Sequence, residues 1–287
     1  IGYGLKDSLW KRGGFAELKL LPQKNITLSF TNSSDYEENG GYHFFQEGYF
    51  GSAINARNYT ISNYDFVKRN EIDFTARVRR YVNVQLSAFN ANKQITNQYL
   101  FNDGTDISLD QFEMSGVQCS IRFSYKERVV ESFNHYYWIN EGYPTIWLQY
   151  CRGINGFWNG QFDYNKITAR FQYYFQTKRL GIANFTIDAG WIDANLPSSE
   201  LFAGRSSYAP LGLNSPYSFQ TMRSNEFMNS EFASLFWLQD LQRSFFRIGK
   251  FQPNIQLATN VSWGILNHPE AHQQSTFTDM HKMYTES

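Results

Sequence analysis

Apolar and polar residues alternate along the stretch GVQCSIRFSYK, at residues 116–126. Val117, Cys119 and Ile121 hold apolar positions, and Arg122 stands in the polar set that alternates with them. A period of two places the two sets on opposite faces of a β-strand. One face of this strand therefore needs an apolar neighbour, and the face with Arg122 needs water or a polar partner.

The same alternation recurs along most of the chain, and helical periodicity is almost absent. The further alternating stretches are residues 16–21, 25–30, 71–79, 81–89, 145–150, 165–175, 180–191, 232–238 and 254–263. About ten strands of roughly ten residues each match the length that crosses a bilayer at a tilt. The pattern predicts an all-β, antiparallel fold, with residues 1–287 as one transmembrane β-barrel domain.

The connections between these stretches fall into two length classes. Tight turns stand at 22–25 and 176–179, whereas the segments 92–108 and 193–225 are long. Short turns at one end and long loops at the other are typical of outer-membrane barrels. Residues 33–56 and 127–142 do not alternate cleanly, so the up-and-down order does not close through them. One further strand could lie in 33–56.

Alternation is also typical of a soluble β-sandwich, so the solvent on the apolar face must be decided by other features. Charges stand in the middle of the polar faces, as a wet lumen permits: Arg77, Arg122, Arg170 and Asp188. Aromatic residues stand near strand ends on the apolar faces, as an interfacial girdle would require: Tyr125, Trp191 and Trp263. We therefore expect a transmembrane barrel with the three arginines lining its lumen. A secreted sandwich or lectin-like domain is the alternative.

The amino-acid composition further limits the classes of protein to which the chain could belong. Lys+Arg and Asp+Glu balance at 26 each among 287 residues, which gives no overall field for binding nucleic acid. Aromatic residues reach 18%, which suits both strands and membrane interfaces. No apolar run approaches the ~18 residues of a transmembrane helix. The predicted location is the bacterial outer membrane.

Catalytic and metal-binding patterns are weak. The sequence has no nucleophile elbow, P-loop, HExxH or CxxC motif, and Cys119 and Cys151 both lie within strand patterns. The segment HPEAH groups His268, Glu270 and His272, near Asp279 and His281, but Pro269 disfavours a helix there. Asp103, Asp106 and Asp110 lack the spacing of a calcium loop. We predict no enzyme activity, no metal and no cofactor.

The long loop at residues 193–225 is unusually apolar. Its apolar residues are Leu196, Leu201, Phe202, Leu211, Leu213, Tyr217, Phe219 and Met222. Such a loop needs a surface to pack on, and in a barrel the lumen offers one. We expect the loop to fold into the lumen, with Arg205 or Arg223 paired to a wall carboxylate such as Asp188 or Glu231. The alternative is an extracellular cap that merely closes the pore.

Three blocks of sequence resemble a known family. They are YPTIWLQYCRGINGFWNGQFDYNKITARFQYYFQTKRLGIANFTIDAG, LPSSELFAGR, and FQTMRSNEFMNSEFASLFWL followed by KFQPNIQLATNVSWGILNHPEAH. They resemble an outer-membrane barrel family of Bacteroidota that carries only an unknown-function label. That family is similar to the bacterial surface antigen superfamily, which includes the barrel-assembly-machinery insertase.

The resemblance implies a barrel of sixteen strands in the full protein, of which about ten to thirteen lie in this chain, truncated at both ends. It also implies a loop that enters the lumen with an arginine motif. The Val-Arg-Gly-aromatic tetrapeptide of the superfamily is absent, and Gly204-Arg205 and Met222–Asn225 are the nearest candidates. No catalytic residue carries over.

The resemblance further implies assistance in inserting, assembling or translocating envelope proteins or lipids, either directly or as an accessory subunit of a complex. Expected partners are outer-membrane lipids, lipopolysaccharide, and other outer-membrane or periplasmic proteins. A porin or a substrate-specific transporter barrel is the alternative.

Overall fold

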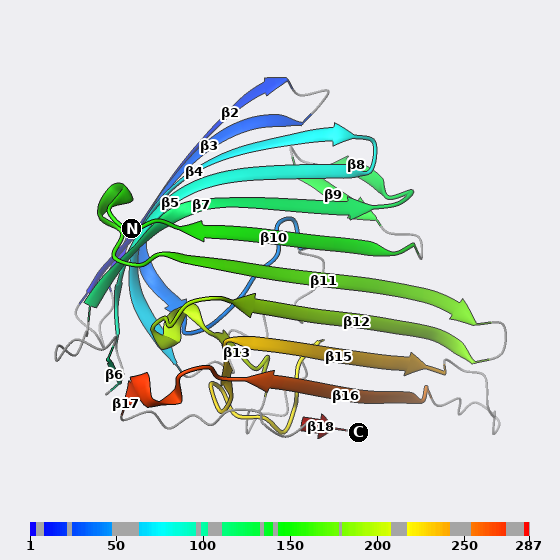
Figure 1. The fold of residues 1–287 in the computed structure, drawn as a ribbon. Helices are drawn as coiled ribbons and strands as arrows, with labels where there is room; N and C mark the ends of the chain where they lie inside the picture. Colours follow the sequence, from blue (N-terminus) through cyan, green and yellow to red (C-terminus); the bar gives the residue numbers. More distant parts are fainter. Residues whose placement is uncertain are drawn as a thin grey trace.

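The computed structural model shows a strongly curved antiparallel sheet, with several connecting segments folded against its inner face (Figure 1). It describes residues 1–3, 9–21, 25–47, 63–95, 99–102, 111–132, 135–139, 143–177, 180–207, 217–241, 254–273 and 284–286. The all-β, antiparallel prediction is confirmed.

The main sheet has twelve strands in chain order, which lies within the predicted ten to thirteen. They are β1 (Gly2–Tyr3), β2 (Trp10–Leu21), β3 (Ile26–Glu38), β4 (Tyr64–Arg79), β5 (Val82–Gln94), β7 (Gln111–Ser124), β10 (Thr145–Gly153), β11 (Tyr164–Thr177), β12 (Gly181–Ile192), β15 (Glu231–Asp240), β16 (Gln256–Ile265) and β18 (Tyr284–Glu286). All ten alternating stretches lie largely within these strands. The sheet is not closed, because β1 and β18 stand at its two ends.

In the described parts of the connections lie three two-stranded pairs and three single turns of 3₁₀ helix. The pairs join β6 (Leu100–Phe101) to β17 (His272–Gln273), β8 (Arg128–Ser132) to β9 (His135–Ile139), and β13 (Phe202–Ala203) to β14 (Met228–Asn229). The 3₁₀ turns are Phe157–Asn159, Ser198–Glu200 and Pro269–Ala271.

The antiparallel order sends successive connections to opposite ends of the sheet. We call the end with the two-residue corner between β4 and β5 the hairpin end, and the end with residues 193–230 the loop end. Of residues 33–56, which the sequence left open, the structure describes 33–47, which continue β3 as far as Glu38 and then leave the sheet at the loop end. Residues 127–142 carry the β8–β9 hairpin at the hairpin end. The up-and-down order therefore closes through both stretches.

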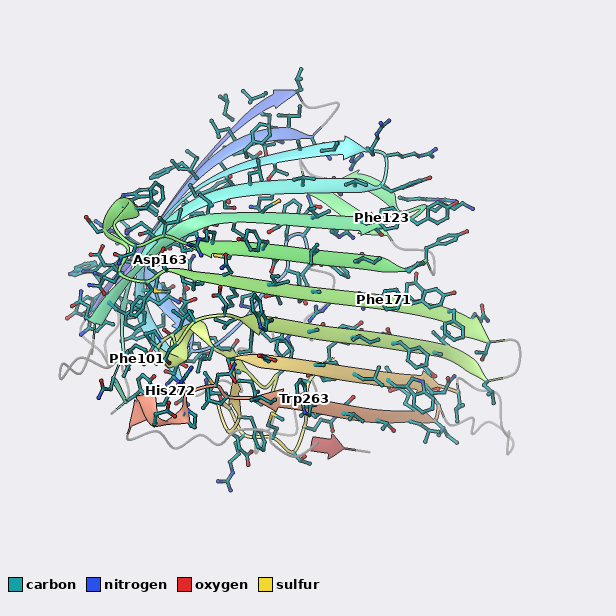
Figure 2. All side chains as sticks on the ribbon, in the orientation of Figure 1. Phe101, Phe123, Asp163, Phe171, Trp263 and His272 are labelled. Atoms are coloured by element: carbon teal, nitrogen blue, oxygen red, sulfur yellow. The ribbon has the colours of Figure 1, made fainter. Side chains whose placement is uncertain are left out.

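One face of the sheet, here called the outer face, presents large apolar side chains to the outside. They include Leu28, Phe30, Ile72, Phe74, Leu86, Val117, Ile121, Ile146, Leu148, Tyr150, Ile167, Phe171, Ile187, Trp191, Leu235, Trp237, Leu257 and Trp263. Their exposed fractions run from 37% to 54%. Figure 2 places Phe123 and Phe171 toward the hairpin end, and Phe101 and His272 at the loop end.

The opposite, inner face is polar along the middle of the strands and is buried. Its buried polar residues include Asp73, Asn83, Ser87, Ser120, Arg122, Ser124, Thr168, Arg170, Thr186, Asp188, Ser234 and Ser262. Toward the loop end the inner face becomes apolar, where Phe112, Met114 and Phe232 pack with Leu201 and Phe202 of the long loop. The protein thus buries a polar surface and exposes an apolar one, which reverses the usual order of a water-soluble domain.

A two-layer sandwich is not what the structure shows. The apolar face of the main sheet has no second sheet of comparable size against it among the described residues, since the other sheets have two strands each. The long strands of the main sheet run from 9 residues in β10 to 16 in β4, whereas strands of globular proteins average about 5–6. Within the described part of the chain, no helix has the length and apolar character needed to cross a membrane.

A close backbone approach at the loop end of β10 gives a test of this packing. A Cβ on Gly153 would lie 1.9 Å from Tyr164 Cε1, and Tyr164 is only 2% exposed. We expect Gly153→Ala to lower the free energy of unfolding by about 1–3 kcal/mol, because the ring must move within a packed site. The measurement is the midpoint of urea unfolding, monitored by tryptophan fluorescence.

Gly13→Ala is the matched control, because nothing lies within 4 Å of a Cβ built on Gly13 in β2. An equal shift for both variants would contradict the packing described at Gly153.

Candidate functional site

A buried ion pair joins two neighbouring strands on the inner face. Arg170 of β11 and Asp188 of β12 are direct partners in the strand register. Arg170 Nε lies 2.5 Å from Asp188 Oδ1, and Arg170 Nη2 lies 2.6 Å from Oδ2. The two side chains are 2% and 0% exposed. This two-pronged geometry fixes both groups in the wall of the sheet and makes Asp188 an acceptor that other segments can share.

Two segments from the loop end complete this cluster. Arg205, on the long loop after β12, places Nη1 3.8 Å from Asp188 Oδ2 and Nη2 3.4 Å from Glu47 Oε1. Glu47, on the segment after β3, also pairs with Arg170 Nη1. Tyr42 on the same segment donates its hydroxyl to Asp188 Oδ2 at 3.1 Å. We call these five residues the latch cluster, because they join both segments to the wall.

The latch cluster is electrically balanced, with two arginines against two carboxylates. Burial opposes the charged form of Glu47, but Arg205 and Arg170 outweigh it and lower the pKa of this carboxyl to about 2. Burial and the neighbouring Asp188 raise the pKa of the Tyr42 hydroxyl well above its usual value, so it remains a donor. The charges of the cluster therefore compensate one another, provided that all its members are present.

Most described residues of the long loop near the latch cluster are buried. Residues 196–203 and 205–207 are all buried, and the last of them, Ser207, donates its N–H to the carbonyl of Phe219 at 2.9 Å. Phe219 in turn donates to the carbonyl of Arg205 at 2.8 Å, so Ser206 and Phe219 form an isolated parallel β-bridge within the loop. The predicted apolar residues Leu196, Leu201, Phe202, Phe219 and Met222 are each at most 1% exposed. Leu211 and Leu213 lie outside the described residues.

The segment after β3 packs tightly against this loop. Gly40 has a φ of +69°, and a Cβ built on it would lie 2.6 Å from Met228 Cε. The carbonyl of Gly40 accepts the N–H of Ala203 at 2.9 Å. Asn225 donates its side-chain amide to the carbonyl of Asn39 at 2.7 Å. The two segments therefore form one joined plug on the inner face.

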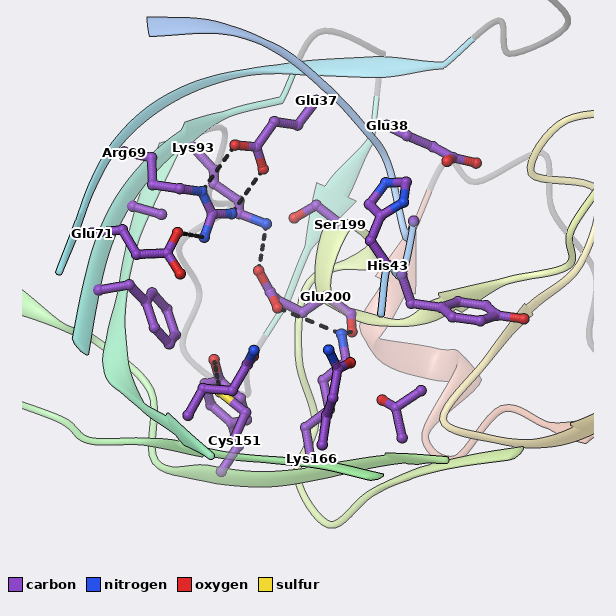
Figure 3. Close-up of a pocket in the computed structure, with 18 of the residues that line it drawn as sticks. Glu37, Glu38, His43, Arg69, Glu71, Lys93, Cys151, Lys166, Ser199 and Glu200 are labelled. Carbon is purple, nitrogen blue, oxygen red and sulfur yellow. Dashed lines mark hydrogen bonds and ion pairs between the residues drawn. The ribbon is translucent and has the colours of Figure 1, made fainter. Parts of the chain in front are cut away.

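A cavity of about 650 Å³ lies between this plug and the wall, beside the latch cluster (Figure 3). Its charged lining residues come from β3, β4, β5, β11 and the loop: Glu37, Glu38, Arg69, Glu71, Lys93, Lys166 and Glu200. Tyrosines, Gln118, Gln149 and Ser199 supply further polar atoms. The cavity is therefore a polar one that can hold water or a polar ligand.

Glu200 connects the loop to two wall lysines in this cavity. Its carboxylate lies 2.5 Å from Lys93 Nζ and 3.8 Å from Lys166 Nζ, and its carbonyl accepts Lys166 Nζ at 2.7 Å. Burial opposes the charged form of Glu200, but Lys93 and Lys166 lower its pKa below the usual value. On β4, the strand next to that of Lys93, Arg69 makes a two-pronged pair with Glu37, at 2.9 and 2.8 Å. The loop is thus held by a second ionic contact.

A third contact joins three connections at the loop end. The N–H of Ser198, on the long loop, donates to the Tyr99 hydroxyl at 3.1 Å. The same hydroxyl lies 2.5 Å from Nδ1 of His272. Burial lowers the pKa of His272 to about 4, so the imidazole is neutral at pH 7.

The residues suggested by the sequence as a loop latch are only partly brought together. Arg205 and Asp188 meet in the latch cluster. Arg223 is exposed, and Glu231 accepts the side-chain amide of Asn267 at 3.3 Å, so neither lies in the cluster. Gly204 donates its N–H to the carbonyl of Phe227 at 3.0 Å and shapes the loop beside Arg205.

The three arginines expected to line a lumen all stand on the inner face. Arg170 belongs to the latch cluster. Arg122 is 4% exposed, pairs with Glu127 at 2.6 Å, and lies 5.4 Å from the ring of Trp147. Arg77 is half-buried, with Nε 3.4 Å from Asn83 Oδ1.

No group of three His, Cys, Asp or Glu side chains in the described residues could hold a metal. His268 Nδ1 lies 3.1 Å from Glu270 Oε1, and both side chains are exposed. Asp279, His281, Asp103, Asp106 and Asp110 lie outside the described residues.

Sequence reasoning missed Tyr42, Glu47, Lys93, Lys166 and Glu200. The first two lie in residues 33–56, which follow no period, although the run GGYHFF offered a signal: glycines that permit a tight turn, followed by aromatics that need burial. Lys93, Lys166 and Glu200 gave no such signal, because a charged residue in a strand or loop does not by itself indicate whether its side chain is buried.

Removing the shared wall carboxylate tests the latch cluster. Asp188→Asn leaves two buried arginines facing one carboxylate, and we expect the free energy of unfolding to fall by about 3–5 kcal/mol. The measurement is the urea midpoint of the purified protein at pH 7. Asp163→Asn is the control, because the Asp163 side chain is 58% exposed and 3.6 Å from Arg152, and should change stability by less than about 1 kcal/mol. Equal losses would contradict the role assigned to Asp188.

The lowered pKa of Glu47 predicts a pH dependence. Because this carboxyl has a pKa of about 2 in the folded protein against an ordinary 4.5, its contribution is present above pH 4.5 and is lost as the pH falls toward 2. We expect Glu47→Gln to lower the free energy of unfolding by about 3 kcal/mol at pH 7. The variant should also show a flatter dependence of this free energy on pH between 4.5 and 2. The measurement is the free energy of chemical unfolding of the wild type and the variant at a series of pH values. An unchanged profile in the variant would contradict the assignment.

Comparison with known proteins gives a family match over part of the chain. No curated protein matches this sequence. Residues 69–192 match the C-terminal domain of a family of unknown function, DUF5686. The matched stretch runs from Arg69 in β4 to Ile192 at the end of β12, so it includes Arg170 and Asp188 but not the long loop. Over the wall strands β4 to β12, this chain is therefore similar to the C-terminal domain of the DUF5686 family.

Proposed function

We propose that this chain is the barrel of an outer-membrane protein of the surface-antigen type, which assists the insertion, assembly or translocation of envelope proteins or lipids. It acts directly or as an accessory subunit of a complex, and without covalent catalysis. The observation that carries the proposal is the reversed burial of the sheet, together with a loop held in the interior by Arg205.

The outer face supports contact with lipid. Its apolar side chains would cost free energy in water, at about 25 cal/mol per Å² of exposed apolar surface, and a hydrocarbon layer removes that cost. The aromatic rings Tyr173, Phe175, Phe185 and Trp237 stack in a row near the hairpin end, with centroids 5.1 to 6.0 Å apart. Trp191 and Trp263 lie near the loop-end termini of their strands. Two aromatic girdles around an apolar band are typical of transmembrane barrels.

The filled interior supports an assembly role over an open pore. The latch cluster and Glu200 attach the plug to the wall by ion pairs, in the place where the resemblance implies a loop with an arginine. An open porin needs a wide aqueous path, whereas here the inner face is buried. In the proposed mechanism, a weak barrel seam and local thinning of the bilayer lower the barrier for a client strand, which pairs at the exposed sheet edge.

The polar cavity beside the plug favours a second candidate. A volume of about 650 Å³ with charged, amide and aromatic side chains has the size of a small-molecule site. A substrate-specific transporter would use such a cavity and would move the plug during each cycle.

Conductance separates a plugged barrel from an open one. In a planar bilayer we expect the wild-type protein to show little steady conductance, because the plug fills the interior. Deleting residues 198–221 should open a large and steady conductance. A large conductance in the wild type that the deletion leaves unchanged would contradict the plugged interior.

Depletion in the native bacterium tests the assembly role. We expect the abundance of several outer-membrane barrels to fall severalfold in quantitative proteomics of isolated outer membranes, and re-expression of the wild type to restore it. Re-expression of Asp188→Asn should restore less. An outer-membrane proteome that depletion leaves intact would reject the assembly role and favour the transporter.

A further inference from the structure

Three exposed cations cluster at the hairpin end, where two neighbouring connections meet. Arg79 ends β4, Arg80 follows it in the corner before β5, and Lys126 follows β7. All three side chains are exposed. The N–H of Ser124 donates to the carbonyl of Tyr81 at 3.0 Å, which ties the two connections together. We call Arg79, Arg80 and Lys126 the basic rim.

Three tyrosines support the basic rim. Tyr81 and Tyr125 meet at 5.2 Å between ring centroids, and Tyr125 and Tyr143 meet at 5.3 Å, both edge to face. Lys126 Nζ lies 5.4 Å from the ring of Tyr125 and 5.1 Å from that of Tyr143, and it donates to the Tyr143 hydroxyl at 3.3 Å. Rings that hold an amine in this way fix its position at the surface while leaving its charge exposed.

The basic rim adjoins the apolar band of the outer face. Tyr125 shares a face with Ile121 and Phe123 on β7, and Leu86 lies on the neighbouring β5. Aromatic rings at the boundary between an apolar surface and exposed cations are typical of the interfacial region of a membrane.

Few acids offset the basic rim locally. The stretches 77–84 and 122–128 contain one carboxylate, Glu127. Its side chain is 7% exposed and pairs with Arg122 on the inner face. These two stretches therefore carry an excess of positive charge, whereas the connection after β7 continues to Glu131 and Glu141 and the chain as a whole is neutral.

We propose that the basic rim binds the phosphate of an anionic phospholipid in the leaflet at the hairpin end. The guanidinium groups bind phosphate oxygens in two-pronged fashion, Lys126 adds a third donor, and the acyl chains lie over Leu86 and Ile121. This inference rests on the proposed function, because it needs the outer face to be in lipid. A neutral headgroup would give these cations no net charge to bind.

Spin-labelled lipids test the proposal in the full chain. The protein is reconstituted in phosphatidylcholine vesicles, and the motionally restricted fraction is measured for labelled phosphatidylglycerol and labelled phosphatidylcholine. We expect the wild type to prefer phosphatidylglycerol by about tenfold, since each basic residue near the surface strengthens binding to an anionic lipid. Salt should weaken the preference, and free glycerol phosphate at millimolar concentration should not displace the lipid.

The triple variant Arg79→Gln, Arg80→Gln, Lys126→Gln should reduce the preference to less than twofold. The matched control is Lys68→Gln, Arg152→Gln, Arg223→Gln, which removes three partly or fully exposed cations toward the loop end and should keep it. An equal preference in the wild type and the triple variant would overturn the proposal. If the wild type restricts neither lipid, the membrane location fails as well. If it restricts both lipids equally, only the phosphate site fails.

Discussion

The pairing of Asp188 with two arginines is the contact on which the interior depends. Asp188 stands in the wall, opposite Arg170 in the strand register, and its Oδ2 also faces Arg205 and Tyr42 from two different connections. A buried carboxylate with so many partners is stable only when all of them are present, because each charge left alone would cost several kcal/mol. The cluster therefore couples the wall, the long loop and the segment after β3 into one unit. Ions of this kind add little net stability over apolar packing, and we propose that their role is to fix the position of the plug.

The second constraint is the reversed distribution of polar and apolar surface. A sheet with a polar face must cover that face or fill it with water, and this chain covers it with its own connections. The apolar face is left outward, and its long strands and aromatic ends suit a bilayer. The alternation of apolar and polar residues along each strand thus produces both surfaces. Where one residue faces lipid in the proposed barrel, the next residue in the strand faces the interior.

Much of this architecture could be predicted from the sequence, because the period of two is a local signal. It identified ten strands and the inner-face positions of Arg77, Arg122 and Arg170, and the apolar composition of residues 193–225 identified the packed loop. The pairing of Arg205 with Asp188 could be proposed only as one of several, since Arg223 and Glu231 were equal candidates in sequence. The positions of Glu47 and Tyr42 could not be found, because they depend on how an aperiodic segment returns across more than a hundred residues to meet Asp188. Glu200, Lys93 and Lys166 could not be predicted as site residues either, because the burial of a charged side chain depends on the tertiary structure.

The most direct test of the lipid-facing exterior is a spin-label scan of β12 in bilayers. Single labels at residues 184 to 187, 189 and 190, in a chain whose Cys119 and Cys151 are replaced by serine, report collisions with oxygen, which concentrates in hydrocarbon. The structure predicts high oxygen access at Phe185, Ile187 and Ala189, and low access at Asn184, Thr186 and Gly190. Oxygen access without this period of two, or equal access of a water-soluble nickel reagent to all six positions, would contradict a lipid-facing outer surface.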